Sequence, residues 1–98
     1  MPPVKPFNSI NPTLSGFQRS LKRLPADVRA LVDDAIIDLC LDPLPGRFDF
    51  KKLKGYRNPN IFTITIGGNH AYKLSLEIRE GVAILRRIGT HKEIDGSP

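Results

Sequence analysis

The sequence predicts an α+β fold, in which two N-terminal helices pack on one face of a small twisted antiparallel β-sheet. Apolar residues recur at helical spacing between residues 14 and 42, whereas after residue 60 they alternate with polar residues in three short runs. Short turns that contain glycine join these runs, and consecutive strands joined in this way are antiparallel. The helices cover one face of such a sheet and leave the other face with its polar side chains.

The first helix is predicted over residues 14–24, with Thr13 or Ser15 as its cap. Pro25 suits the first turn of a second helix, because the N–H that proline lacks would be unpaired there. This second helix is expected to end before Pro43, since the residue that precedes a proline is pushed out of the helical region.

The second helix carries more apolar residues than one stripe requires. The stripe itself consists of Val28, Leu31, Val32, Ala35, Ile36 and Leu39. We interpret Ile37, Leu41 and Leu44 as further core residues, with the edge of a groove for a partner helix as the alternative. The one cysteine, Cys40, is interpreted as a small buried apolar residue, and a single cysteine excludes a disulfide framework and a cysteine-rich metal site.

The strands are expected mainly in the second half of the chain. Residues 1–12 form an arm with at most one edge strand at 7–11, and 48–53 is a candidate strand in a stretch rich in proline and glycine. The three main strands are predicted at 61–66, 70–78 and 82–88, followed by a flexible tail at 95–98. Because 98 residues suffice for one two-layer core but not for two, residues 1–98 are expected to form a single domain.

The composition indicates a soluble protein that binds a polyanion. No apolar run approaches a membrane span, and the proline-rich start lacks the apolar centre of a signal peptide, so we expect a cytoplasmic protein with no membrane partner. Six of the ten acids lie between residues 27 and 49, whereas residues 47–57 hold five cations and one acid. This segregation predicts a basic surface of the kind that binds nucleic acid.

His91 follows the last predicted strand and lies close in sequence to Arg86, Arg87 and Lys92. An imidazole held beside fixed cations suits acid/base chemistry on an anion, and the alternative is a solvated surface histidine. The polar sheet face is expected to carry Thr63, Thr65, Lys73 and one of the two arginines. That combination predicts a seat for a phosphodiester, although the strand register leaves the choice of arginine open.

Four segments, in order, resemble those of a known family: residues 17–25 (FQRSLKRLP), 51–60 (KKLKGYRNPN), 71–78 (AYKLSLEI) and 85–94 (LRRIGTHKEI). They are similar to the first-helix end, the helix–sheet junction, the central strand and the C-terminal signature of the RelE/ParE superfamily of bacterial toxins from type II toxin–antitoxin modules. The resemblance covers residues 7 to 95 and implies a RelE-like fold.

The GTH motif at 89–91 looks most like the YafQ-type branch, as do KGYR at 54–57 and YKL at 72–74. Members of the mRNA-interferase branch cleave messenger RNA in the ribosomal decoding site. The resemblance implies that His91 is catalytic and that Lys51 and Arg87 face the RNA. It also implies a cognate antitoxin protein, the ribosome and mRNA as partners.

RNA cleavage without a metal requires a proton to leave the ribose 2′-OH, the phosphoryl charge to be stabilised and the 5′-oxygen to gain a proton. We assign His91 as the general acid, with a base role left open, and Lys51, Lys52 or Lys54 as support for the 2′-OH. Arg87 or Arg86 is assigned to hold the phosphate in bidentate contact. No metal or other cofactor is expected, because the acids do not cluster with either histidine.

Further contacts with RNA or phosphate are assigned to Arg47, Arg57, Lys73, Arg86, Lys92, His70 and Tyr56. Phe48 and Tyr72 are additional candidates for base stacking, with Tyr72 placed preferentially in the core. His70 is interpreted as an ordinary hairpin residue, and a second acid/base histidine is the alternative.

The chain departs from the family pattern at two places. Thr63 and Thr65 occupy a strand in which the family often has arginines, and Asp95 stands where it commonly has an aromatic residue. Two other functions therefore stay open beside an mRNA interferase that inhibits translation. One is a ParE-like toxin that poisons DNA gyrase without catalysis, and the other is a decayed toxin that retains only antitoxin binding.

Overall fold

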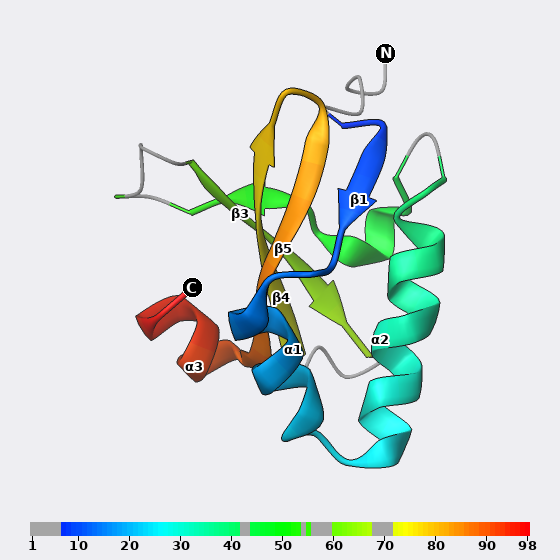
Figure 1. Ribbon diagram of the computed structural model, residues 1–98, viewed down its shortest axis with the longest axis vertical. Coiled ribbons are helices and arrows are strands. Elements are labelled where there is room, and N and C mark those ends of the chain that lie inside the picture. Colours follow the sequence, from blue (N-terminus) through cyan, green and yellow to red (C-terminus); the bar gives the residue numbers. More distant parts are fainter. Residues whose placement is uncertain (1–6, 42–43, 54, 56–59, 68–71) are drawn as a thin grey trace.

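The computed structural model describes residues 7–41, 44–53, 55, 60–67 and 72–98 (Figure 1). Its helices are α1 (Ser15–Lys22), α2 (Ala26–Asp38), the short 3₁₀ helix η1 (Gly46–Phe48) and α3 (His91–Gly96). Its strands are β1 (Ser9–Asn11), β2 (Lys51–Lys52), β3 (Ile61–Ile66), β4 (Tyr72–Arg79) and β5 (Val82–Thr90). The five strands form one sheet in the order β1-β5-β4-β3-β2.

The sheet is mixed, which corrects the prediction of a purely antiparallel one. The three pairs from β2 to β5 are antiparallel, but β1 pairs with β5 in parallel, from Ser9 opposite Val82 to Asn11 opposite Ile84. The short turns in the sequence determine the direction of consecutive strands only, and β1 pairs with a strand far along the chain. The edge strand expected in the arm is present, whereas the prediction of two helices misses α3.

Both N-terminal helices start and end differently from the prediction. Leu14 occupies the N-cap of α1 without a side-chain hydrogen bond, and the Thr13 hydroxyl donates to Asn11 Oδ1 instead, at 2.6 Å. The α2 helix ends at Asp38, well before Pro43. Beyond it the amides of Cys40 and Leu41 donate to carbonyls three residues back, which is the tightening typical of a helix end.

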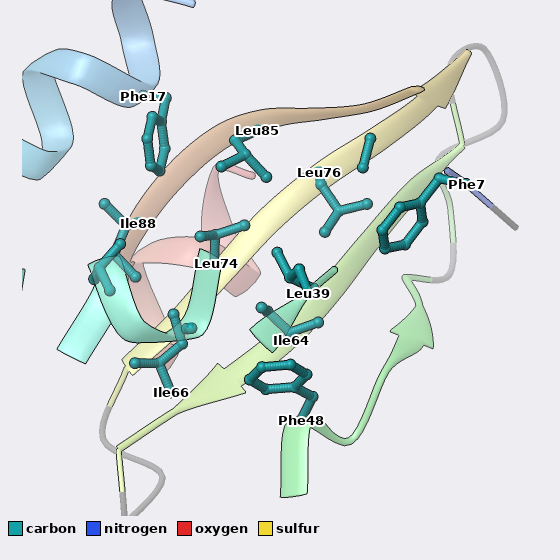
Figure 2. Packing of buried hydrophobic residues seen from close by; sticks show 13 residues of the cluster. Phe7, Phe17, Leu39, Phe48, Ile64, Ile66, Leu74, Leu76, Leu85 and Ile88 are labelled. Carbon is teal, nitrogen blue, oxygen red and sulfur yellow. The ribbon is translucent and has the colours of Figure 1, made fainter. Parts of the chain in front are cut away.

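The core lies between the helices and one face of the sheet (Figure 2). Its buried members include Phe17, Val32, Ala35, Leu39, Phe48, Ile64, Ile66, Leu74, Leu76, Leu85 and Ile88. Residues from α1, α2, η1 and the three long strands therefore share one apolar cluster. Burial of such side chains is the main source of stability in a small domain.

Part of the apolar surface of α2 stays outside this core. Ile37 and Leu41 are 67% and 51% exposed and Cys40 is also exposed, so their assignment to the core is wrong. Leu44 is half-buried and packs against the cluster. The sheet covers a single face of the helix, so only the narrow stripe that contains Val32 and Leu39 is buried against it.

The α1 helix is attached to the open edge of β5. Pairing with β1 stops at Ile84, so the following backbone groups of β5 need other partners. The Ile88 amide donates to Ser20 Oγ at 3.1 Å, and this hydroxyl donates to the Phe17 carbonyl at 2.9 Å. One serine thus links the helix to the strand through both its acceptor and its donor.

We predict that Ser20→Ala lowers the free energy of unfolding by about 1–3 kcal/mol, because it leaves the Ile88 amide without its acceptor. Urea denaturation of the purified protein measures this change. Ser15→Ala is the matched control, since this exposed serine of α1 should change stability by less than about 0.5 kcal/mol. Equal effects of the two substitutions would contradict the role assigned to Ser20.

Candidate functional site

The sheet face opposite the core carries a row of polar residues across four strands. Lys51 lies opposite Thr63, Thr63 opposite Ser75, and Ser75 opposite Arg87. Thr65 and Lys73 form the next pair along β3 and β4. Lys51 and Arg87 are three strand spacings apart, about 14 Å between their backbones.

A bulge in β5 brings both arginines to this face, where the sequence predicted only one of them. The register shifts between Ser75 and Leu76, which lie opposite Arg87 and Leu85, so Arg86 is the extra residue on β5. Arg86 also reaches the polar face, where its Nη1 donates to Glu77 Oε1 at 2.7 Å. Both arginines therefore point to this side of the sheet.

Glu77 is the counter-charge of the polar face. Its side chain is 8% exposed and also accepts a hydrogen bond from Arg79 Nε at 2.6 Å. Burial tends to raise the pKa of Glu77, but the hydrogen bonds and charges of Arg79 and Arg86 together outweigh it and hold this pKa below its ordinary value. Arg86 is thus largely neutralised within the protein.

The C-terminal segment Asp95–Pro98 covers much of the polar face. Asp95 Oδ1 lies 3.0 Å from the Lys73 ammonium, and the Pro98 carbonyl accepts from Arg86 Nε at 3.4 Å. Arg87 Nη1 donates to Ser97 Oγ at 3.2 Å. The residues Thr63, Thr65, Lys73, Ser75 and Glu77 are each no more than 6% exposed. On the predicted phosphodiester seat, oxygen atoms of the chain itself therefore lie against Lys73, Ser75 and the two arginines, and the expected tail begins inside α3.

His91 is the first residue of α3, and a capping box fixes its backbone. The Thr90 hydroxyl accepts from the Glu93 amide, while Glu93 Oε1 accepts from the Thr90 amide at 3.0 Å. A side chain at Gly89 would meet the same Glu93 oxygen at 3.2 Å, so glycine leaves room for this contact. The Thr-x-x-Glu pattern at 90–93 is a sequence signal for the start of α3, which is absent from the predicted elements. His91 Nε2 is buried and has no hydrogen-bond partner in the part of the chain that the structure describes.

The other predicted site residues are dispersed. Lys51 is exposed and forms an ion pair with Asp49 at 3.3 Å. Lys51 and Lys52 form the short strand β2. The neighbouring Phe50 stacks on Phe62, with ring centres 5.2 Å apart, and this contact supports the strand. Lys92 is exposed on α3. Lys54, Tyr56, Arg57 and His70 lie outside the described residues.

Arg47 belongs to a different part of the surface. It forms an ion pair with Asp38 of α2 and lies over the Phe48 ring, 5.0 Å from its centre. Arg47 and Phe48 line a groove of about 400 Å³ between α2, η1 and the end of β3, together with the exposed Leu31.

Arg87 lines another groove, of about 380 Å³, where α1 and α3 lie side by side at the end of β5 (Figure 1). Its other charged members are Arg19, Arg23 and Glu93. His91, Lys51 and Lys52 are not among the residues that line this groove. Arg19 and Arg23 are not among the site residues predicted from the sequence, although their spacing of four residues places them on one polar side of a helix.

The described part of the chain contains neither a metal-binding cluster nor a helix suited to a membrane. No group of three or more His, Cys, Asp or Glu side chains there is arranged to hold a metal ion. None of its helices combines the length and the apolar character that crossing a membrane requires.

The comparisons with known proteins point to one structural class. The chain is similar to a chain of the crystal structure of the RelB-RelE antitoxin-toxin complex from Methanococcus jannaschii, with a TM-score of 0.64 and 28% sequence identity. The alignment covers 92% of this chain and 99% of the other. No protein-family model and no curated protein matches the sequence. The α+β fold is thus RelE-like, and this likeness supports the RelE-like toxin superfamily.

The lowered pKa of Glu77 predicts an acid-sensitive contribution to stability. Because this pKa is lower in the folded protein than in the unfolded chain, the contribution is complete above the ordinary value of 4.5 and is lost as the pH falls through the folded value. Glu77→Gln should therefore cost about 1 kcal/mol at pH 7 and less at pH 3. Urea unfolding at both pH values measures this, with Glu80→Gln as the control in the exposed β4–β5 turn. An equal loss at both pH values would contradict the role of the Glu77 charge.

Proposed function

We propose that this protein is the toxin of a type II toxin–antitoxin module and cleaves mRNA on the ribosome without a metal ion. The likeness in fold to the RelB-RelE complex carries the proposal. The GTH motif at 89–91 supports the nuclease branch, because a toxin that only binds its target needs no proton-transfer group at the start of α3. We infer a cytoplasmic location, where ribosomes and mRNA are found.

The proposed antitoxin docks along α2. The structural neighbour is a complex of an antitoxin with a toxin, and here Leu31, Ile37 and Leu41 are exposed apolar residues on or next to one helix. An amphipathic helix or extended segment would cover them and the adjoining groove of about 400 Å³. The basic remainder of such a small protein would add attraction to an acidic partner.

The proposed reaction uses the substrate's own 2′-oxygen. That oxygen loses its proton, attacks the adjacent phosphorus and displaces the 5′-oxygen, which takes up a proton. His91 supplies this last proton, the lysines at and after Lys51 support the 2′-oxygen, and Arg87 holds the phosphate. The ribosome positions the mRNA, since a domain of this size offers few contacts that select a sequence.

RNA must replace the oxygen atoms that now cover the polar face. The Asp95 carboxylate on Lys73 and the Pro98 carbonyl on Arg86 occupy positions suited to phosphate oxygens. Movement of the segment Asp95–Pro98 would free Lys73, Arg86 and Arg87 from their present contacts with it.

For the reaction, we predict that His91→Ala reduces ribosome-dependent mRNA cleavage by about 10²–10⁴-fold, which is the usual contribution of a general acid or base. Mapping of mRNA ends after incubation with translating ribosomes measures this loss. His70→Ala should retain cleavage, and a thermal melt of each variant verifies folding. Loss of cleavage in His70→Ala with retention in His91→Ala would overturn the assignment.

For the covering segment, we predict that Asp95→Asn tightens the binding of single-stranded RNA by about fivefold, or about 1 kcal/mol, because it removes a partly exposed ion pair that competes with phosphate. Fluorescence anisotropy with a labelled oligonucleotide measures the affinity. Asp33→Asn makes the same change of charge on the exposed side of α2 and should have a smaller effect. Equal tightening by both substitutions would mean that Asp95 acts only through net charge.

One observation favours a second candidate, a ParE-like toxin that poisons DNA gyrase. Lys51 and Arg87 lie three strands apart, and the Nε2 atom of His91 is buried rather than open to a substrate. Intact mRNA together with double-stranded DNA breaks would establish this candidate in place of the first. A decayed toxin would produce neither effect and would still bind its antitoxin.

A further inference from the structure

The groove between α1, α3 and the end of β5 contains three guanidinium groups that the proposed reaction does not fully use. Arg19 and Arg23 are exposed on α1, and Arg87 is exposed on β5. Within the described ranges, none of the three forms a salt bridge. In contrast, the arginines at 47, 79 and 86 are each paired with a carboxylate.

One carboxylate, that of Glu93, faces these three groups. Its Oε1 atom already accepts hydrogen bonds from the amide and the hydroxyl of Thr90, both at 3.0 Å. These bonds lower the pKa of Glu93, and the nearby charge of Arg23 lowers it further. Glu93 is therefore ionised at neutral pH but engaged in the helix cap, and the groove keeps an excess of positive charge.

The shape and lining of the groove suit a chain of phosphates. Its volume of about 380 Å³ lies at the small end of the range for ligand sites. Arg19 and Arg23 are one helical turn apart, with about 5–6 Å between their Cβ atoms, which is comparable to the spacing of successive phosphates along a strand. Ile88 and Ile94, two of its apolar members, are buried, so the groove offers little hold for the apolar anchor of a peptide.

We propose that Arg19 and Arg23 bind backbone phosphates of the RNA next to the phosphate held by Arg87, so that the strand passes from the end of β5 across α1. This inference rests on the proposed function, because it takes RNA as the ligand. A guanidinium group can donate two parallel hydrogen bonds to one phosphate, and it stays charged at any physiological pH. Ser97 is the one residue of the covering segment among those that line the groove, and both arginines are exposed, so this part of the path is open while Asp95–Pro98 is docked.

The test compares two variants that lose the same charge. Arg19→Ala/Arg23→Ala removes both groove arginines, and Lys22→Ala/Arg29→Ala removes two exposed cations that do not line the groove. Binding of a ten-nucleotide 2′-O-methyl RNA, which lacks the attacking hydroxyl, is measured by anisotropy over a range of salt concentrations. We expect the groove variant to bind this RNA at least tenfold more weakly than the control. The slope of log affinity against log salt concentration should become shallower by about 0.7 for each lost phosphate contact.

Cleavage of mRNA on translating ribosomes is measured with the same proteins, and a thermal melt verifies that each is folded. If the wild-type protein fails to cleave but the groove variant still loses RNA affinity, the proposed function is wrong and the RNA-binding groove stands. Equal RNA affinity of the two variants overturns the groove, whatever the cleavage result. A loss of affinity for an acidic peptide with unchanged RNA affinity would also overturn it.

Discussion

The structure depends on satisfying the backbone hydrogen bonds of β5. This strand pairs with β4 on one side over most of its length, but β1 covers its other side only as far as Ile84. A buried amide without an acceptor costs about as much as a lost hydrogen bond, so the exposed part of the edge has to be closed. Ser20 closes it at Ile88, and the same contact holds α1 next to the end of β5. The groove with Arg19 and Arg23 exists because the helix is placed there.

The extra residue in β5 determines which face of the sheet carries Arg86 and Arg87. Leu85 and Ile88 both enter the core although they are three residues apart, and only a bulge returns the second of them to the same face. Arg86 and Arg87 thereby reach the opposite face together. Glu77 neutralises Arg86, while Arg87 donates to a serine hydroxyl, so two adjacent arginines have different electrostatic surroundings. This difference makes Arg87 the better candidate for a phosphate contact.

The elements with strong periodicity were predictable from the sequence, but their long-range arrangement was not. Helices around Phe17 and Val32 and the three long strands follow from the spacing of apolar residues. The parallel pairing of β1 depends on a partner far along the chain, which no local pattern encodes. The helix of His91 was predictable from its capping box, and the spacing of Leu85 and Ile88 carried a sign of the bulge. The assignment of Lys51, Arg87 and His91 to one site came from the family resemblance, which does not report distances across a sheet.

The C-terminal segment also affects how the protein can be handled. The Pro98 carbonyl lies against Arg86 and the Ser97 hydroxyl against Arg87, so this end of the chain is seated on the polar sheet face. A purification tag or fluorescent protein fused after Pro98 would have to leave from the middle of that surface. Such a fusion would displace the seated oxygen atoms or block the approach of a large ligand. Preparations that differ only in the position of the tag would then differ in their affinity for a large ligand of this face.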